Sequence, residues 1–165
     1  MNIFGIIGWK NSGKTGLMER LVSEITKRGF KVSTIKHAHH SFDIDHEGRD
    51  SFRHRQAGAS EVLLSSNNRW ALMHELRAEL EPNFSDLISK MKPVDLILVE
   101  GFKKEKHSKL ECHRTENNEK LIYRIDRSVC LIASDILIDD VSIPNIDLDD
   151  TVGIANFILK NQGMI

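Results

Sequence analysis

The chain has 165 residues, of which 40% are hydrophobic and 28% are charged, and its formal net charge is −1. This balance is ordinary for a soluble globular protein and gives no reason to expect nucleic acid or an anionic membrane as the main partner. No apolar run approaches the ~20 residues of a membrane span, and the two cysteines match neither a disulfide framework nor a zinc motif. We therefore expect a single cytoplasmic domain over residues 1–165.

The first half of the chain alternates strands with helices. Apolar periodicity predicts a strand at 2–7, a helix at about 14–28 that Gly29 ends, and a second strand at 30–37. A polar, histidine-rich segment follows, and then a short helix at 50–57. Two short strands at 61–66 and 69–75 flank the turn Asn67-Asn68, which predicts an antiparallel pair.

The second half continues the alternation. One apolar helical face spans 84–91, and "VDLILVE" at 94–100 reads as a buried strand. We expect a hairpin from 109–114 and 120–125, an apolar strand at 128–134, and a last helix from about Asp149 to Lys160. The pattern predicts an α/β fold on a mostly parallel central sheet, which the paired strands would make partly mixed.

The string Gly-Trp-Lys-Asn-Ser-Gly-Lys-Thr at 8–15 matches G-x-x-x-x-G-K-[ST] in full, between the first strand and the first helix. Gly8 and Gly13 allow the backbone to curl so that several N–H groups converge on phosphate oxygens. Lys14 would reach the β- and γ-phosphates, and the Thr15 hydroxyl would bind Mg²⁺. The other interpretation is a glycine turn with a surface lysine. The complete motif in this context favours a nucleotide site made by Gly8, Lys10, Asn11, Ser12, Gly13, Lys14, Thr15 and Gly16.

Acidic residues at two strand ends are candidates for the metal side of this site. Glu100 ends the buried strand at 94–100, and ligands of open α/β sheets bind beyond such ends. We assign Lys14 and Glu100 to catalysis, and Glu100 and Thr15 to Mg²⁺ binding. The loop after the second strand adds Asp45 and Asp50 as metal candidates, although either could equally form a turn or cap a helix.

The segment at 36–55 is rich in histidine and arginine. Metal binding, anion binding and a solvated loop all remain open for the cluster His37, His39 and His40, with His46 nearby. Arg49, Arg53 and Arg55 could bind phosphates or a partner's acidic residues, or simply face solvent.

Three strings together resemble the MobB family of molybdopterin-guanine dinucleotide biosynthesis adapter proteins: "GIIGWKNSGKT", "STIKHAHHSFDIDHEGRDSFRHRQAGA" and "VDLILVEGFK". The resemblance covers about residues 3–104. It implies a three-layer P-loop NTPase fold that binds GTP and Mg²⁺, with weak GTPase activity. It also implies a homodimer that assists the guanylyltransferase attaching GMP to molybdopterin, with molybdopterin as a further ligand. By position, 11–15 would hold phosphates and Mg²⁺, Glu100 would be the Walker B acid, and Asp45 or Asp50 a Mg²⁺-side acid.

The sequence departs from a standard GTP site in lacking an N-K-x-D motif. Asp135, just past the apolar strand at 128–134, is the nearest substitute whose carboxylate could accept hydrogen bonds from guanine. It could equally be an aspartate at a strand end with no role in binding. A small-molecule kinase is the alternative function, although no arginine-rich lid is evident late in the chain. A degenerate nucleotide binder that acts only as a scaffold is a third.

Overall fold

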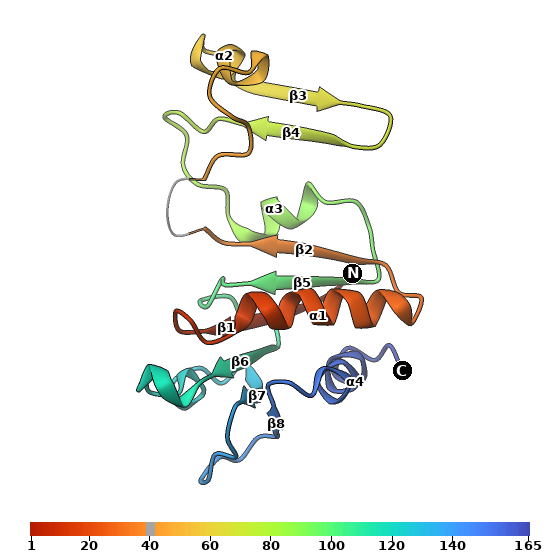
Figure 1. The fold of residues 1–165 in the computed structure, drawn as a ribbon, viewed down its shortest axis with the longest axis vertical. Helices are drawn as coiled ribbons and strands as arrows, with labels where there is room; N and C mark the ends of the chain where they lie inside the picture. Colours follow the sequence, from red (N-terminus) through yellow and green to blue (C-terminus); the bar gives the residue numbers. More distant parts are fainter. Residues whose placement is uncertain (39–41) are drawn as a thin grey trace. The chain divides into compact units, whose positions relative to one another are not determined.

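The computed structural model describes residues 1–38 and 42–165, which form two compact units (Figure 1). The larger unit comprises residues 1–37 and 91–165, and the smaller one residues 38–90. In the described part of the chain, no helix is long and apolar enough to cross a membrane.

The larger unit is built on a six-stranded sheet with the order β2-β5-β1-β6-β7-β8. All its strand pairs are parallel. Its strands are β1 (Asn2–Gly8), β2 (Val32–Lys36), β5 (Leu96–Glu100), β6 (Lys109–His113), β7 (Val129–Ser134) and β8 (Asn145–Asp147). The inner strands are almost wholly buried, which is why they read as continuous apolar runs.

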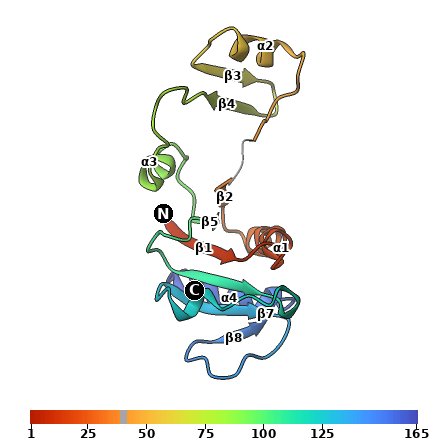
Figure 2. The ribbon, with the colours of Figure 1, turned by 90° about the vertical axis from the view of Figure 1, so that its left-hand side faces the viewer.

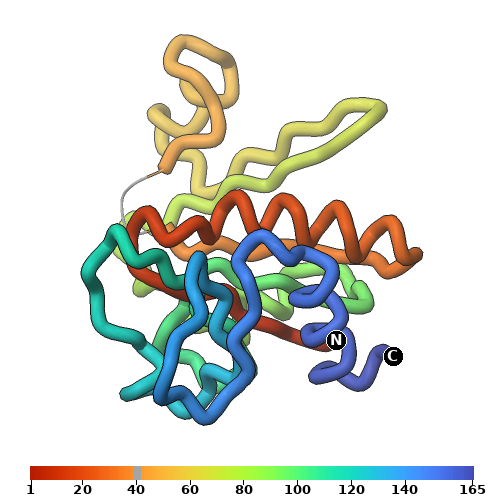
Figure 3. The backbone as a smooth tube through the Cα atoms, turned by 60° about the horizontal axis from the view of Figure 1, so that its bottom comes forward, coloured from red at the N-terminus to blue at the C-terminus, as the bar shows by residue number. Residues whose placement is uncertain are grey.

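Two helices cover one face of this sheet. α1 (Lys14–Lys27) and α4 (Thr151–Asn161) lie side by side (Figure 3). Leu17, Leu21 and Ile158, which lie on these helices, share one buried cluster with Phe4 and Ile6 of β1. The period-2 alternation of β1 therefore points its largest apolar side chains at the helices.

The other face of the sheet is covered by connecting segments and short 3₁₀ helices. Ile7, Ile122 and Val129 form a second buried cluster there. Gly5 also faces this side, because a Cβ at Gly5 would lie 2.6 Å from Nε2 of His107. The missing side chain of Gly5 lets the segment before β6 approach the strand.

The α/β class and the mostly parallel central sheet are confirmed, and two details differ. The antiparallel pair β3 (Glu61–Ser65) and β4 (Trp70–His74) forms a sheet of its own instead of joining the central one. The expected hairpin of 109–114 with 120–125 is wrong. The carboxylate of buried Glu111 accepts hydrogen bonds from the amides of Ile122 and Tyr123, each at 2.8 Å, and the chain there forms the 3₁₀ helix η2 (Ile122–Arg124). A second 3₁₀ helix, η1 (Thr115–Asn117), follows β6.

The parallel arrangement places the carboxyl ends of β1, β5, β6 and β7 at one edge of the sheet, and both chain termini lie away from that edge (Figure 3). Arg20 of α1 fixes the chain after β8 by donating to the Leu148 carbonyl at 2.7 Å and to Thr151 Oγ1 at 2.9 Å. The middle of α1 is therefore held to the segment between β8 and α4.

In the smaller unit, α2 (Asp50–Gln56) packs beside the β3–β4 hairpin (Figure 2), and α3 (Phe84–Ser89) follows. Val62 and Met73 face each other and are buried. On the opposite face of the hairpin, Leu63, Trp70 and Leu72 are 62%, 57% and 46% exposed. The hairpin thus has one packed and one open apolar face.

Polar contacts hold the smaller unit together. The guanidinium of Arg55 donates to Asp43 at 2.6 Å, to Asp45 at 2.5 Å and to Glu75 at 2.8 Å. The hydrogen bond from Arg55 lowers the pKa of Asp45. His74, the last residue of β4, contacts two glutamates, of which Glu61 raises its pKa most.

Candidate nucleotide-binding site

The loop between β1 and α1 turns tightly because three of its residues have positive φ. These are Gly8 (148°), Asn11 (61°) and Gly13 (86°). Glycine reaches this region without strain, and asparagine is among the few other residues that tolerate it. Gly13 also precedes α1 without a side chain to cap it, so amides at the start of the helix are free to donate to a ligand. The loop therefore has the backbone conformation that a phosphate cradle needs.

Close packing adds a second requirement for glycine at the start of the loop. Gly8 pairs with Cys112 of β6, and a Cβ at Gly8 would lie 2.4 Å from the Cys112 carbonyl oxygen and 2.5 Å from Ser12 Oγ. Neither contact is sterically allowed. Ser12 is itself buried, and its amide donates to the Trp9 carbonyl at 3.3 Å.

The side chain of Lys14 lies across the concave side of the loop. Its Nζ is 2.5 Å from the Trp9 carbonyl oxygen and 3.3 Å from Ser12 Oγ. Burial lowers the pKa of Lys14, and the charges of Lys103 and Lys36 lower it further, against the opposing charge of Glu100. Several cations therefore converge here, as binding of a polyanion requires.

Glu100 lies where the sequence predicts it, at the carboxyl end of β5 beside β1. Its backbone pairs with Ile6 and Lys36, and its carboxylate is 3.2 Å from Lys36 Nζ. The side chain is only 12% exposed. Glu100 and the hydroxyl-bearing Thr15, the second residue of α1, offer the oxygen ligands that Mg²⁺ prefers.

Asp135 follows β7 at the same edge of the sheet. Its carboxylate accepts from the Thr115 amide at 3.1 Å and from Thr115 Oγ1 at 2.9 Å. Partial burial would raise the pKa of Asp135, but these hydrogen bonds outweigh it and lower the pKa. Asp135 is therefore an ionised acceptor held beside the end of β6.

Arg114 is a residue that the sequence interpretation missed. It follows β6 directly, and its Nε lies 3.2 Å from the point where a Cβ of Gly13 would stand. Arg49 and Arg53, which the sequence suggested, belong instead to the smaller unit. Arg114 could have been identified from its position immediately after a predicted strand, because ligands of parallel sheets bind beyond the carboxyl ends of the strands.

Apart from His37, which belongs to the larger unit, the remaining candidates are in the smaller unit or outside the described residues. Asp45 is paired with Arg55, and Asp50 is the first residue of α2. His39 and His40 lie outside the described residues, whereas the His37 ring packs on Phe102 with centroids 4.8 Å apart. Within residues 1–38 and 42–165, no group of three or more His, Cys, Asp or Glu residues is arranged to hold a metal.

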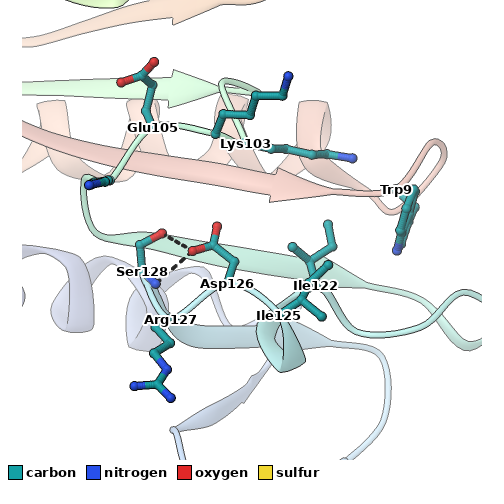
Figure 4. Close-up of a pocket in the computed structure, with 10 residues that line it drawn as sticks. Trp9, Lys103, Glu105, Ile122, Ile125, Asp126, Arg127 and Ser128 are labelled. Carbon is teal, nitrogen blue, oxygen red and sulfur yellow. Dashed lines mark hydrogen bonds between the residues drawn. The ribbon is translucent and has the colours of Figure 1, made fainter.

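A cleft of about 750 Å³ adjoins the phosphate loop at Trp9 (Figure 4). The Trp9 indole N–H donates to the Lys120 carbonyl at 2.8 Å, and Lys103 Nζ is 4.4 Å from the centre of the indole ring. The far wall carries Ile122, Ile125 and other residues of the segment before β7. Trp9 thus links the phosphate loop to the segment that follows Glu100.

Comparison with known proteins identifies the family. The family model of molybdopterin guanine dinucleotide synthesis protein B matches residues 3–135. The molybdopterin-guanine dinucleotide biosynthesis adapter protein of Escherichia coli is 38% identical over 164 residues, which cover 96% of this chain and 91% of that protein. Its counterpart in Haemophilus influenzae is 37% identical, with 94% and 86% covered. The chain belongs to the MobB family.

Solved structures of MobB proteins share the fold. The crystal structure of Bacillus subtilis MobB superposes with a TM-score of 0.78 at 23% identity, covering 98% of both chains. A crystal structure of molybdopterin-guanine biosynthesis protein B gives a TM-score of 0.72 at 25% identity, covering 96% of this chain and 99% of the other. The resemblance seen in the sequence is therefore confirmed. The curated MobB relatives are named as adapter proteins, which does not favour the kinase alternative.

Proposed function

We propose that this MobB-family chain is a GTP-binding adapter in molybdopterin guanine dinucleotide biosynthesis, with weak Mg²⁺-dependent GTPase activity. The observation that carries the proposal is the loop at 8–15, whose three positive φ angles and overlying Lys14 form a phosphate cradle at the start of α1. The family membership supplies the pathway in which such a nucleotide would be used.

The phosphates are bound by the amides of the loop and of the first turn of α1, from Lys10 to Gly16. The Lys14 ammonium neutralises the β- and γ-phosphates, since it already lies on the concave side of the loop. Thr15 and Glu100 would hold Mg²⁺. The bound ion supplies positive charge that screens the phosphate oxygens.

Hydrolysis is slow in this proposal. Glu100 orients the attacking water, while Lys14 and the loop amides stabilise negative charge that develops on the γ-phosphate. In the described part of the chain, the Glu100 carboxylate pairs with Lys36 and with neither a glutamine nor an arginine. Slow GTP hydrolysis suits an adapter protein, for which the nucleotide that is bound matters more than the rate at which GDP is produced.

Guanine is read by Asp135. An ionised carboxylate accepts from the N1 and N2 donors of guanine and finds no such donor pair on adenine. The hydrogen bonds from Thr115 hold this carboxylate at the ligand edge in a defined orientation.

The partners are a molybdopterin guanylyltransferase, molybdopterin and a second copy of this chain. Support for the homodimer comes from the open apolar face of the β3–β4 hairpin, with Leu63, Trp70 and Leu72 exposed. Contiguous exposed apolar residues of this kind favour association.

Calorimetric titration tests the proposed nucleotide. GTP and GDP should bind in the presence of Mg²⁺ at least about tenfold more tightly than ATP and ADP. Lys14→Ala should abolish binding while the urea midpoint of unfolding stays close to that of the parent chain. Equal affinities for guanine and adenine nucleotides would contradict the guanine assignment. Binding unchanged in Lys14→Ala would contradict the site itself.

A further inference from the structure

Arg114 is positioned as a ligand contact of the phosphate loop. The residue is half-buried, and its guanidinium packs against Gly13, with Nε and Nη2 at 3.2 and 3.6 Å from the Cβ position of that glycine. In the part of the chain that the structure describes, no group accepts a hydrogen bond from this guanidinium. Its fixed fork of N–H donors is therefore available to an anion at the loop.

The strand order decides which end of a nucleotide Arg114 would meet. β5 lies on one side of β1 and carries Glu100, whereas β6 and β7 lie on the other side. Arg114 follows β6, and Asp135 follows β7. The metal-side acid and the guanidinium thus lie on opposite sides of the phosphate loop.

The charges of Arg114 and Asp135 support the view that both residues lie on the β6–β7 side of the loop. The positive charge of Arg114 contributes to the lowered pKa of Asp135, so the two side chains are near each other. Leu148, which also packs on Gly13, closes this side of the loop. A nucleotide with its γ-phosphate toward Glu100 would have its nucleoside end here.

We propose that Arg114 binds the α- and β-phosphates, the part of the nucleotide that GDP and GTP share, and does not act on the γ-phosphate. This inference rests on the proposed function, because it assumes a nucleotide in the loop. Hydrogen bonds between a guanidinium and phosphate are charge-assisted and frequently bidentate. Losing them should weaken binding of both nucleotides by about 10- to 100-fold.

The test compares the affinities of GTP and GDP, measured by calorimetry with Mg²⁺, in four chains: the parent, Arg114→Ala, Arg114→Lys and Arg124→Ala. Arg124, an exposed residue of η2, is the matched control. Arg114→Ala should lose affinity for both nucleotides by the same factor. Arg114→Lys keeps the charge without the fork and should recover part of the loss, and Arg124→Ala should match the parent.

Three results would overturn the inference. If Arg114→Ala binds both nucleotides as the parent does, the guanidinium only packs against Gly13. If binding is kept and single-turnover GTP hydrolysis slows, Arg114 acts on the γ-phosphate. If the parent chain itself binds neither nucleotide, the proposed function fails and this inference fails with it, a result distinct from the first two.

Discussion

Replacing Gly8 by alanine should destabilise the larger unit strongly. The new Cβ would stand 2.4 Å from the Cys112 carbonyl oxygen, a backbone atom of the neighbouring strand, and 2.5 Å from Ser12 Oγ. The Ser12 hydroxyl can rotate away, but the carbonyl belongs to β6 and is paired with Gly8 in the sheet. Relief therefore requires β1 and β6 to separate at this pair.

The magnitude follows from two separate costs. Holding alanine at a φ of 148° costs about 1–3 kcal/mol of backbone strain. Forcing a methyl group into a packed site costs about another 1–3 kcal/mol. We expect Gly8→Ala to lose about 2–6 kcal/mol, a large share of the ~5–15 kcal/mol that stabilises a typical native domain.

Gly16→Ala is the matched control for this prediction. Gly16 lies within α1, and the nearest atom to its Cβ position is Arg20 Nη1 at 3.6 Å, an ordinary contact. Alanine there should stabilise the helix by up to about 1 kcal/mol. Urea unfolding followed by circular dichroism measures both changes. A Gly8→Ala midpoint equal to that of the parent, at the same slope, would refute the close packing described for this loop.

Three further predictions concern other parts of the molecule. In a Trp70→Phe chain, GTP with Mg²⁺ should change the emission of Trp9, and a similar change in a Trp9→Phe chain would contradict this. Glu111→Ala should cost about 2–5 kcal/mol in urea unfolding, because two buried amides lose their acceptor, whereas Glu111→Gln should cost less. His74, whose pKa is raised by its two glutamate partners, should stabilise the fold fully below about pH 6.5 and lose this contribution as pH rises through the folded pKa. In melting curves across that range, His74→Gln should flatten the pH dependence, and an unchanged profile would refute the pairing.

The conformation of the loop at 8–15 could be predicted from the sequence because its requirements are local. Gly8 and Gly13 have positive φ and lie five residues apart in the chain, and Lys14 and Thr15 directly follow Gly13. The position of Glu100 was predictable for a related reason. An apolar strand run has a definite end, and all parallel strands present that end at one edge.

Features that depend on distant contacts were not predictable in this way. Residues 120–125 look like a strand by composition. In the structure, the amides of Ile122 and Tyr123 instead donate hydrogen bonds to the buried carboxylate of Glu111. No pattern in the sequence near these residues indicates that Glu111 will be their acceptor. Arg114 becomes a neighbour of Gly13 only once β6 is known to lie beside β1. Likewise, nothing local shows whether the β3–β4 pair joins the central sheet or stands alone.

A crystal structure grown with GTP and Mg²⁺ tests the central claim most directly. We expect the β-phosphate inside the loop at 8–15, with backbone amides at about 2.7–3.2 Å from its oxygens and the Lys14 ammonium moved onto the β- and γ-phosphates. Nucleotide bound elsewhere, or a loop whose amides face the protein interior while the nucleotide is present, would contradict the account.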